Sequence, residues 1–292
     1  MTRYLIRRTL LMIPVLVAAS LLVFLAVHLS PGDPVDLIAG PLASEEIRQQ
    51  VRVRLGLDKS LPQQYFIYIA HIAQGDLGRS VLSRQPVAEL VRIKLPITLE
   101  LGIAAFLVTY LVAVPLGVIA ALHRNSLTDY VSMILALLGV SMPSFWFALI
   151  LIYVFAVALG WFPPTGYGGL RYLILPAVAL GLPRVGRVAR MMRSSMLEVI
   201  GQDYIRTARA KGLPERTVVL VHAVRNALLP ILSLMGLDLG YVLGGSVVIE
   251  NVFARSGVGD MMLKAIYSRD FPVLQGAMLI LTAAIVVGNI IA

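Results

Sequence analysis

The sequence predicts an all-α polytopic membrane protein with six transmembrane helices. Of its 292 residues, 58% are hydrophobic and only 14% are charged, and the mean hydropathy of +0.84 lies far outside the range of ordinary soluble domains. A membrane-spanning helix needs about 20 consecutive apolar residues to cross a hydrocarbon layer of roughly 30 Å. Runs of that length occur at about 9–30, 97–122, 131–158, 227–249 and 272–292, and a weaker sixth run occurs at about 172–192.

The first apolar run is interpreted as a retained span. Arginines precede it, as they would precede the apolar part of a secretory signal. However, the run is longer than the roughly 7 to 15 residues of such a signal, and no Ala-x-Ala cleavage site follows it. The sequence therefore divides into this first span in 1–30, a connection in 31–96, and five further spans in 97–292.

Composition and spacing exclude several kinds of site. The chain has no cysteine, so disulfides, thiolate metal sites and a cysteine nucleophile are excluded. Neither His28 nor His222 has a second metal-ligating side chain at a suitable spacing, so we expect no metal site. The net charge of +9 is explained by loop arginines near the membrane, so we expect no nucleic-acid partner.

The distribution of Lys and Arg predicts a cytoplasmic amino terminus. With that orientation the inside segments hold 13 of these residues and the short outside loops hold 4. Cytoplasmic loops carry the excess of positive charge in membrane proteins. The remaining 8 lie in the connection 31–96, which is too long for the rule to apply.

The connection 31–96 is predicted to be an extracytoplasmic helical insertion. Ser44 is placed as the N-cap of a first helix, with two glutamates in its first turn and apolar residues at Ile47, Val51 and Leu55. A second helix is expected to open at Pro62 and close near Gly75, and a third to open at Pro86. Their amphipathic faces suggest packing on one another or on the membrane surface.

The fourth span is predicted to continue beyond the bilayer. Its apolar run, from Tyr172 to Pro183, is too short to cross alone. One face of the following helix is apolar and the rest carries arginines, so we expect an amphipathic rod on the cytoplasmic side whose first arginines reach the headgroups. The apolar face comprises Val185, Val188, Ala189, Met192 and Met196, and the arginines are Arg184, Arg187, Arg190 and Arg193.

The stretch DYIRTARAKGLPERTVVLVHAVRNALLP, residues 203–230, predicts a helix, a sharp turn and a second helix. Asp203 can cap the first helix, whose apolar positions alternate with basic ones: Ile205, Ala208 and Leu213 with Arg206, Arg209 and Lys211. Gly212 and the Leu213-Pro214 pair end it, and the second helix is expected to bend into the fifth span at Pro230.

A hairpin of this kind fits either of two surfaces. Binding to anionic lipid and docking on another protein have similar weight on physical grounds. The rigid turn favours protein docking, and so do the small side chains of Thr207, Ala208 and Ala210, which would let another surface approach closely.

This stretch resembles the EAA loop of the transmembrane subunits of ABC importers. The match runs from Asp203 to Gly212 and from His222 to Pro230, in the variant of the dipeptide, oligopeptide, glutathione and nickel permease family, first-permease type. Arg206 departs from the broad importer consensus in the way that this subfamily does. Further matching segments are PGDP at 31–34, LIAGP at 37–41, GLD at 56–58, GDLGRS at 75–80, GGSVVIENVFARSGVG at 244–259 and RDFP at 269–272.

The resemblance implies the type I ABC importer transmembrane-domain fold, with 97–292 as the core permease domain in the cytoplasmic (inner) membrane. It also implies a homologous second permease, two ABC ATPase subunits that bind ATP and Mg, an extracytoplasmic solute-binding protein and membrane lipid as partners. The helix from Asp203 would be the coupling helix that sits in a groove of the ATPase. The implied coupling residues are Asp203, Tyr204, Arg206, Thr207, Ala208, Arg209, Lys211, Gly212, Leu213, His222, Arg225, Asn226 and Pro230.

The sequence gives no sign of catalysis by this chain. None of its four lysines follows a glycine, so the phosphate-binding pattern GxxxxGK[ST] is absent. HExxH and GxSxG are absent too, so the chain is expected to be a non-catalytic subunit.

Asp238, near the middle of the fifth span, has two interpretations of equal weight. A carboxylate at that depth is costly, so it faces either a watery path or a hydrogen-bonding partner. With Tyr241 and Ser233 it is a candidate for the translocation path. Gly236, Gly240 and Gly244 form a small-residue ladder on another side of the same helix, expected to pack against a neighbour.

Other polar or kinked positions in the spans are expected to be structural. Pro115 and Pro143 are expected to kink their helices. Glu100 and Glu250 lie near the outer ends of spans, where a carboxylate can reach water.

Two alternatives to an ATP-driven importer remain open. An ion-coupled secondary transporter would use Asp238, and a membrane-embedded enzyme would need paired catalytic groups, whereas the sequence offers only isolated ones. For an importer, dipeptides or oligopeptides are the first choice of substrate, with glutathione close behind.

Overall fold

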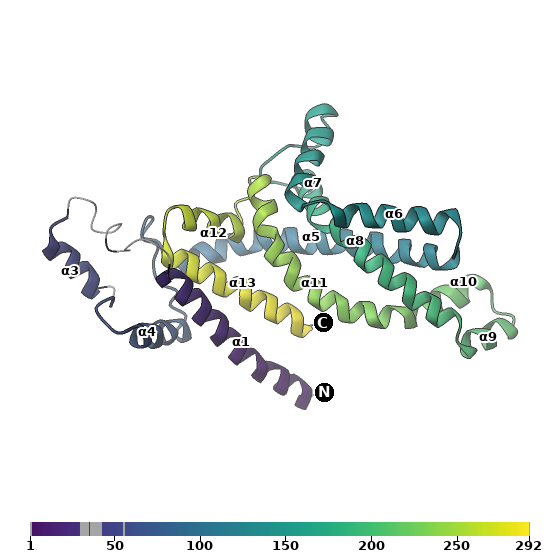
Figure 1. Ribbon diagram of the computed structural model, residues 1–292, viewed down its shortest axis with the longest axis horizontal. Helices are drawn as coiled ribbons and strands as arrows, with labels where there is room; N and C mark the ends of the chain where they lie inside the picture. The colour runs from purple at the N-terminus through teal and green to yellow at the C-terminus, as the bar shows by residue number, and fades with distance from the viewer. Residues whose placement is uncertain (1, 30–34, 36–42, 55, 292) are drawn as a thin grey trace. The chain divides into compact units, whose positions relative to one another are not determined.

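The computed structural model describes residues 2–29, 35, 43–54 and 56–291, and the described residues form helices and loops without a β-strand (Figure 1). The chain divides into two compact units. Unit 1 comprises Met1–Thr98 and Ser256–Val286, and unit 2 comprises Leu99–Arg255 and Val287–Ala292. Leu55 and the PGDP and LIAGP segments lie outside the described residues.

Unit 1 begins with α1 (Thr2–Leu29), the predicted first span, followed by α3 (Glu45–Arg54) and α4 (Leu61–Ala73). The Ser44 cap is confirmed, because its hydroxyl accepts a hydrogen bond from the Ile47 amide at 3.4 Å. The second predicted helix is confirmed as α4. It starts one residue before Pro62 and ends two residues before Gly75.

The helix α4 packs on α1. The Tyr65 hydroxyl donates to the Val17 carbonyl at 3.1 Å and lies 3.0 Å from the Ser20 hydroxyl. The rings of Tyr65 and Phe24 meet edge to face, with centroids 5.4 Å apart. The amphipathic helix of the insertion therefore uses the first span as its packing surface.

A single helix, α5 (Val87–Leu122), spans 36 residues and joins the end of the insertion to the second span. The third helix predicted at Pro86 therefore does not stand apart from that span. In unit 1 the first turns of α5 pack with α12 (Val258–Tyr267) and α13 (Phe271–Ile291) around Val87, Met261 and Ala277. A Cβ added to Gly276 would lie 2.6 Å from the Val87 side chain, so the contact requires glycine.

In unit 2 the expected third span is interrupted. It consists of α6 (Leu127–Ser141), a break at Met142 and Pro143, and then α7 (Ser144–Leu151), which continues as the π-helix η1 (Ile152–Ala158). Pro143 therefore separates two helices rather than kinking one, and Figure 1 shows α7 turned steeply away from α6. Proline lacks the amide hydrogen needed to continue the backbone ladder.

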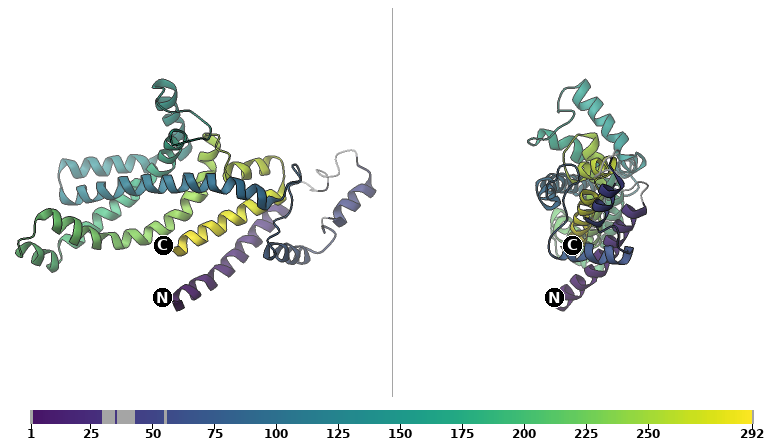
Figure 2. Two further views of the ribbon diagram at one scale, coloured as in Figure 1. Left: turned by 180° about the vertical axis from the view of Figure 1, so that it is seen from behind. Right: turned by 90° about the vertical axis from the view of Figure 1, so that its left-hand side faces the viewer.

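The fourth span and its extension form one helix, α8 (Arg171–Ile200), which confirms the predicted rod. All five residues of the predicted apolar face are between 0 and 3% exposed. Helix α8 lies along α6 and α11 (Val224–Val252), and Figure 2 shows these long helices from behind.

In unit 2, α5 and α8 approach closely at glycines that the sequence analysis did not single out. A Cβ on Gly181 would lie 2.4 Å from the Ala105 carbonyl oxygen, and one on Gly117 would lie 2.6 Å from the Met192 side chain. The Thr109 hydroxyl donates to the Gly181 carbonyl at 2.9 Å. In contrast, a Cβ on Gly244 would meet no described heavy atom within 4 Å, so none of the described residues packs on that end of the predicted ladder.

The predicted hairpin is present in unit 2. It comprises α9 (Asp203–Ala210), the short α10 (Glu215–Thr217) and the π-helix η2 (Val218–Ala223), which leads without a break into α11. Pro230, where the second helix was expected to bend, lies inside α11. The departure from α geometry comes earlier, in the π-helix η2. In Figure 1 the hairpin lies at the right-hand end of the unit.

Four helical segments among the described residues are long and apolar enough to cross a membrane. They are Val87–Leu122, Gly169–Ile200, Glu215–Val252 and Phe271–Gly288. Met12–Leu25 and Ser144–Ala158 are shorter apolar helices. The all-α membrane fold is thereby confirmed, and the number of six spans stays a prediction.

Candidate functional site

Helix α9 is held in place by its apolar face. Ile205 is 0% exposed and Ala208 is 7% exposed, and both join the core formed by Met196 of α8 and Val218 of η2. A helix of eight residues is not stable alone in water, so this packing, rather than intrinsic propensity, maintains α9.

The burial of Ala208 corrects one expectation. Its small side chain was expected to let another protein approach, but it faces the core of its own chain. The other two small residues, Thr207 and Ala210, are exposed and remain available for a close contact.

The turn between α9 and α10 has the geometry that the glycine and proline predicted. Gly212 has φ +73°, a left-handed conformation that disfavours other residues, and its amide donates to the Arg209 carbonyl at 2.9 Å. Pro214 then caps α10. At the other end of α9 the N-cap is Gln202, so Asp203 occupies the first turn instead of the predicted cap position.

An ion pair that the sequence analysis missed closes this turn. The Arg209 guanidinium donates to both carboxylate oxygens of Glu215, at 2.6 and 3.1 Å. Hydrogen bonding to this carboxylate raises the pKa of Arg209 above its usual value. Both side chains are exposed, so water weakens the pair, but its two-point geometry favours the closed form of the turn.

A second polar link joins α9 to α11. The Asn226 side-chain amide donates to the Tyr204 hydroxyl at 3.0 Å and to the His222 carbonyl at 2.9 Å. Both contacts join residues of the predicted coupling set, so the structure brings the two halves of the motif together. The hairpin is consequently tied to the rest of unit 2 by its core, its turn and this amide.

The outward surface of α9 carries polar and basic side chains, while η2 exposes Leu220 and Val221. Of the thirteen coupling residues implied by the resemblance, Ala208 is buried, His222 is half-buried, and the following are exposed: Asp203, Tyr204, Arg206, Thr207, Arg209, Lys211, Gly212, Leu213, Arg225, Asn226 and Pro230. An exposed, rigid, cationic helix end of this kind suits a partner with acidic groups.

In the spans, Asp238 lies in a polar cluster rather than on an open surface. It is 2% exposed, accepts a hydrogen bond from the Tyr110 hydroxyl at 2.7 Å, and forms an ion pair with Arg184. The Arg184 guanidinium also lies over the Tyr241 ring, with its carbon 3.4 Å from the centroid. This arrangement fits the hydrogen-bonded interpretation of Asp238.

Three expectations about this region change or stay open. Arg184 does not snorkel to the headgroups, because the buried carboxylate of Asp238 holds its side chain inward. Tyr241 and Ser233 are exposed, as lining residues would be, so their place on a path stays a prediction. Gly236 and Gly240 are buried, as packing residues would be.

Of the two carboxylates expected to reach water at the outer ends of the spans, Glu250 is buried and corrects the expectation, whereas the Glu100 side chain is 40% exposed and agrees with it. Glu250 is 0% exposed, and Glu100 accepts a hydrogen bond from Arg255 at 2.9 Å. Arg255 is itself 1% exposed and also donates to the Tyr172 carbonyl at 3.3 Å. This arginine therefore joins the end of α11 to α5 and to the start of α8.

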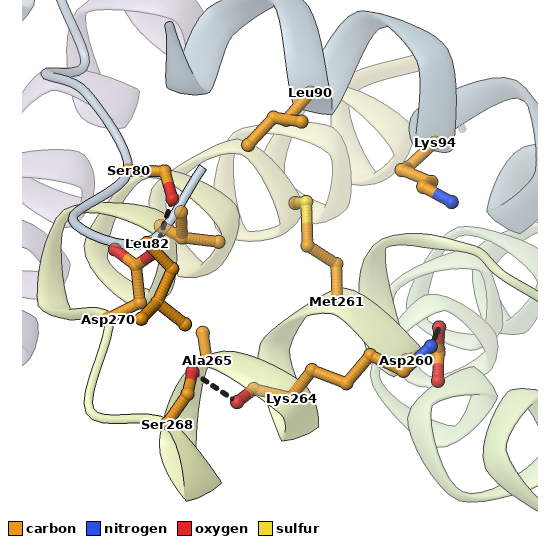
Figure 3. Close-up of a pocket in the computed structure, with 11 residues that line it drawn as sticks. Ser80, Leu82, Leu90, Lys94, Asp260, Met261, Lys264, Ala265, Ser268 and Asp270 are labelled. Atoms are coloured by element: carbon orange, nitrogen blue, oxygen red, sulfur yellow. Dashed lines mark hydrogen bonds and ion pairs between the residues drawn. The ribbon is translucent and has the colours of Figure 1, made fainter. Parts of the chain in front are cut away.

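In unit 1 a hollow of about 190 Å³ lies between α5, α12 and the loop before α5 (Figure 3). The buried Asp270 carboxylate accepts hydrogen bonds from the Ser80 hydroxyl at 2.5 Å and the Val81 amide at 3.1 Å. Lys264 pairs with Asp260 at 2.7 Å. These polar groups are paired with one another. We therefore interpret the hollow as structural: its hydrogen bonds join the GDLGRS segment to the RDFP segment.

Comparison with known proteins places the chain among membrane transport components. Residues 113–292 match the family model described as the inner membrane component of binding-protein-dependent transport systems, and residues 1–102 match the model of its N-terminal part. A relative from Brucella suis, named a peptide transport system permease protein, is 46% identical over 100% of this chain and 95% of its own length. Relatives from Salmonella choleraesuis and Escherichia coli, both named glutathione transport system permease protein GsiC, are 42% identical over the same shares.

Proposed function

Because the chain belongs to the family of binding-protein-dependent transport system inner membrane components, we propose that it is the permease subunit of an ABC importer for peptides or glutathione. The names of its relatives support this function: one is a peptide permease and others are glutathione permeases. An oligopeptide or dipeptide is our first choice of substrate, with glutathione the second. Both are small solutes that carry carboxylates and amide groups.

The observation that carries the proposal is the braced hairpin. Its core residues Ile205 and Ala208, the Arg209–Glu215 pair and the Tyr204–Asn226 contact hold α9 rigidly on the ends of α8 and α11. A rigid element can convert the movement of a docked partner into movement of the helices to which it is joined. The exposed face of α9 is the proposed contact with an ABC ATPase, which would bind ATP and Mg and supply the energy.

The orientation follows from this assignment. The hairpin lies on the cytoplasmic side of the inner membrane, and the 31–96 insertion lies outside. A second, homologous permease would complete the pathway, as the resemblance implies. The alternative of an ion-coupled transporter leaves the braced hairpin without a role.

The outer contact for a solute-binding protein is proposed on unit 1. We propose that the insertion and the segment 251–271 both contribute to this contact. Unit 1 contains most of both, and two hydrogen bonds to the Asp270 carboxylate join their described residues: from the Ser80 hydroxyl at 2.5 Å and from the Val81 amide at 3.1 Å. Exchanging both segments between two permeases should transfer the preference for a binding protein, and unchanged docking would count against this contact.

The experiment that tests the proposed function is co-purification from the native membrane in mild detergent. We expect a tagged chain to bring down ATPases with phosphate-binding loops, together with a second related permease. A mutant of α9 with Arg206→Glu and Lys211→Glu should retain the permease and lose the ATPases, because both residues are exposed and neither supports the core. Recovery of the chain alone, or only with copies of itself, would contradict an ATP-driven importer.

A further inference from the structure

The geometry points to a charged latch within the membrane: Arg184 and Asp238 fasten α8 to α11 so that the two helices move as one body. Arg184 is therefore a positioning residue: it holds α8 and α11 together, and it affects the translocation path only through the movement of these helices. The inference rests on the proposed function, since it concerns how the movement of the hairpin reaches the spans.

The contacts join three helices at one carboxylate. Arg184 extends from α8 and lies between two side chains of α11, pairing with Asp238 and covering the ring of Tyr241. Tyr110 of α5 donates to the second oxygen of Asp238 at 2.7 Å. The Asp238 side chain is 2% exposed and that of Arg184 is 12% exposed, so water does little to weaken the pair.

A charged pair resists separation in a way that apolar contacts in lipid do not. Apolar side chains that part within a membrane meet lipid of similar polarity, so packing alone opposes sliding only weakly. Separating Arg184 from Asp238 would leave two buried, uncompensated charges, which is strongly unfavourable. The contact therefore has two discrete states, closed or broken, instead of a continuous range.

The position of the latch matters because α8 and α11 are the helices on either side of the hairpin. Their inner ends share one apolar core with α9, through Met192 and Met196 of α8 and Ala227 and Ile231 of α11. The latch adds a polar contact to that apolar one. A displacement of α9 is then transmitted to both helices together, whereas without the latch one helix could move and the other lag.

The same cluster is a weak candidate for a proton carrier. A carrier must exchange its partner during the cycle, but both oxygens of Asp238 are already occupied, by a guanidinium and by a phenol. The pair is also electrically neutral as a unit. Uptake by the wild-type transporter that follows a proton gradient without nucleotide would overturn both the latch and the proposed function.

The test compares two arginine–aspartate pairs on the same helix. The latch variant is Arg184→Gln with Asp238→Asn, which removes both charges and leaves no isolated one. The matched control is Arg193→Gln with Asp129→Asn, because that pair joins α8 to α6 and not to α11, with distances of 2.6 and 2.7 Å. Complete transporters are reconstituted in proteoliposomes, and ATP hydrolysed per substrate molecule imported is measured.

We expect the latch variant to raise this ratio on the order of fivefold or more, the lower end of typical coupling between sites. The control should stay close to the wild type. Equal ratios for all three transporters, or a larger change in the control, would overturn the latch. If the latch variant does not assemble, Tyr110→Phe keeps both charges and should give a smaller rise in the same direction, and no rise would count against the latch.

A distance measurement separates failure of the latch from failure of the proposed function. The chain has no cysteine, so spin labels can be attached at introduced cysteines replacing the exposed Arg190 on α8 and Leu237 on α11. For the wild type, the latch predicts one narrow distribution of distances between the two labels, and nucleotide should not change it. For the latch variant, it predicts a broader distribution even without nucleotide. If the wild type imports nothing with ATP but shows these distributions, only the proposed function fails; a broad wild-type distribution would reject the latch.

Discussion

Replacing Gly212 should uncouple ATP hydrolysis from transport while leaving the complex assembled. Gly212 has φ +73°, and an added Cβ would meet no described heavy atom within 4 Å. The cost of substitution is therefore backbone strain alone, about 1–2 kcal/mol for an ordinary residue in the left-handed region and more for a β-branched one. A penalty of that size lowers the population of the native turn by roughly 5- to 30-fold.

Three substitutions provide the test. Gly212→Asn should be nearly neutral because asparagine tolerates the left-handed conformation, Gly212→Ala should be intermediate, and Gly212→Val should be the most severe. The assay is ATP consumed per substrate imported by the reconstituted transporter, with co-purification as the control for assembly. Normal coupling by the valine variant, or asparagine as harmful as valine, would refute the role of this turn.

Three further predictions concern the stability of the chain in detergent, measured by thermal unfolding. Arg255→Met should cost about 1.5–3 kcal/mol, because it removes the hydrogen bonds of a buried guanidinium to Glu100 and to the Tyr172 carbonyl, while Glu100 keeps its contact with water. A change under about 1 kcal/mol would contradict the role of Arg255 in joining α5, α8 and α11. Gly181→Ala should destabilise the chain by about 1–3 kcal/mol, because its Cβ would lie 2.4 Å from a carbonyl oxygen, whereas the control Gly244→Ala should be neutral. Equal effects of the two substitutions would show that stability does not depend on the close contact between α5 and α8. The guanidinium of Arg193 lowers the pKa of Asp129, so the stabilisation by this carboxylate should be complete above its ordinary pKa of about 3.9 and lost as pH falls through the lowered value. The stability gap between the wild type and Asp129→Asn should then be constant from pH 5 to 7 and shrink below about pH 4, and a gap independent of pH would contradict the pair.

Elements with a strong local pattern were predictable from the sequence. The extension of α8 followed from apolar residues at helical spacing, and all of them are buried. The turn at Gly212 and Pro214 followed from residues whose backbone preferences leave few conformations. The cap at Ser44 and the start of α4 followed from similar local rules.

Contacts between distant residues were not predictable by the same means. Asp238 and Arg184 are 54 residues apart, and nothing in the local pattern distinguishes Arg184 from the other arginines of α8. The glycines that allow α5 and α8 to approach, Gly117 and Gly181, belong to no regular four-residue repeat on their helices, so no pattern drew attention to them. Conversely, the regular ladder that ends at Gly244 suggested a contact that the described chain does not make there.

The central claim is that α9 is the contact with an ATP-hydrolysing partner. Because the chain has no cysteine, a single introduced cysteine can report on that contact without background from this subunit. Thr207→Cys places it on the exposed face of α9, and Gln85→Cys places a control in the loop before α5. We predict that a short bifunctional cross-linker joins position 207 to the ATPase in the native membrane and leaves position 85 unlinked to it. Cross-linking of the ATPase at position 85 but not at 207 would contradict the account.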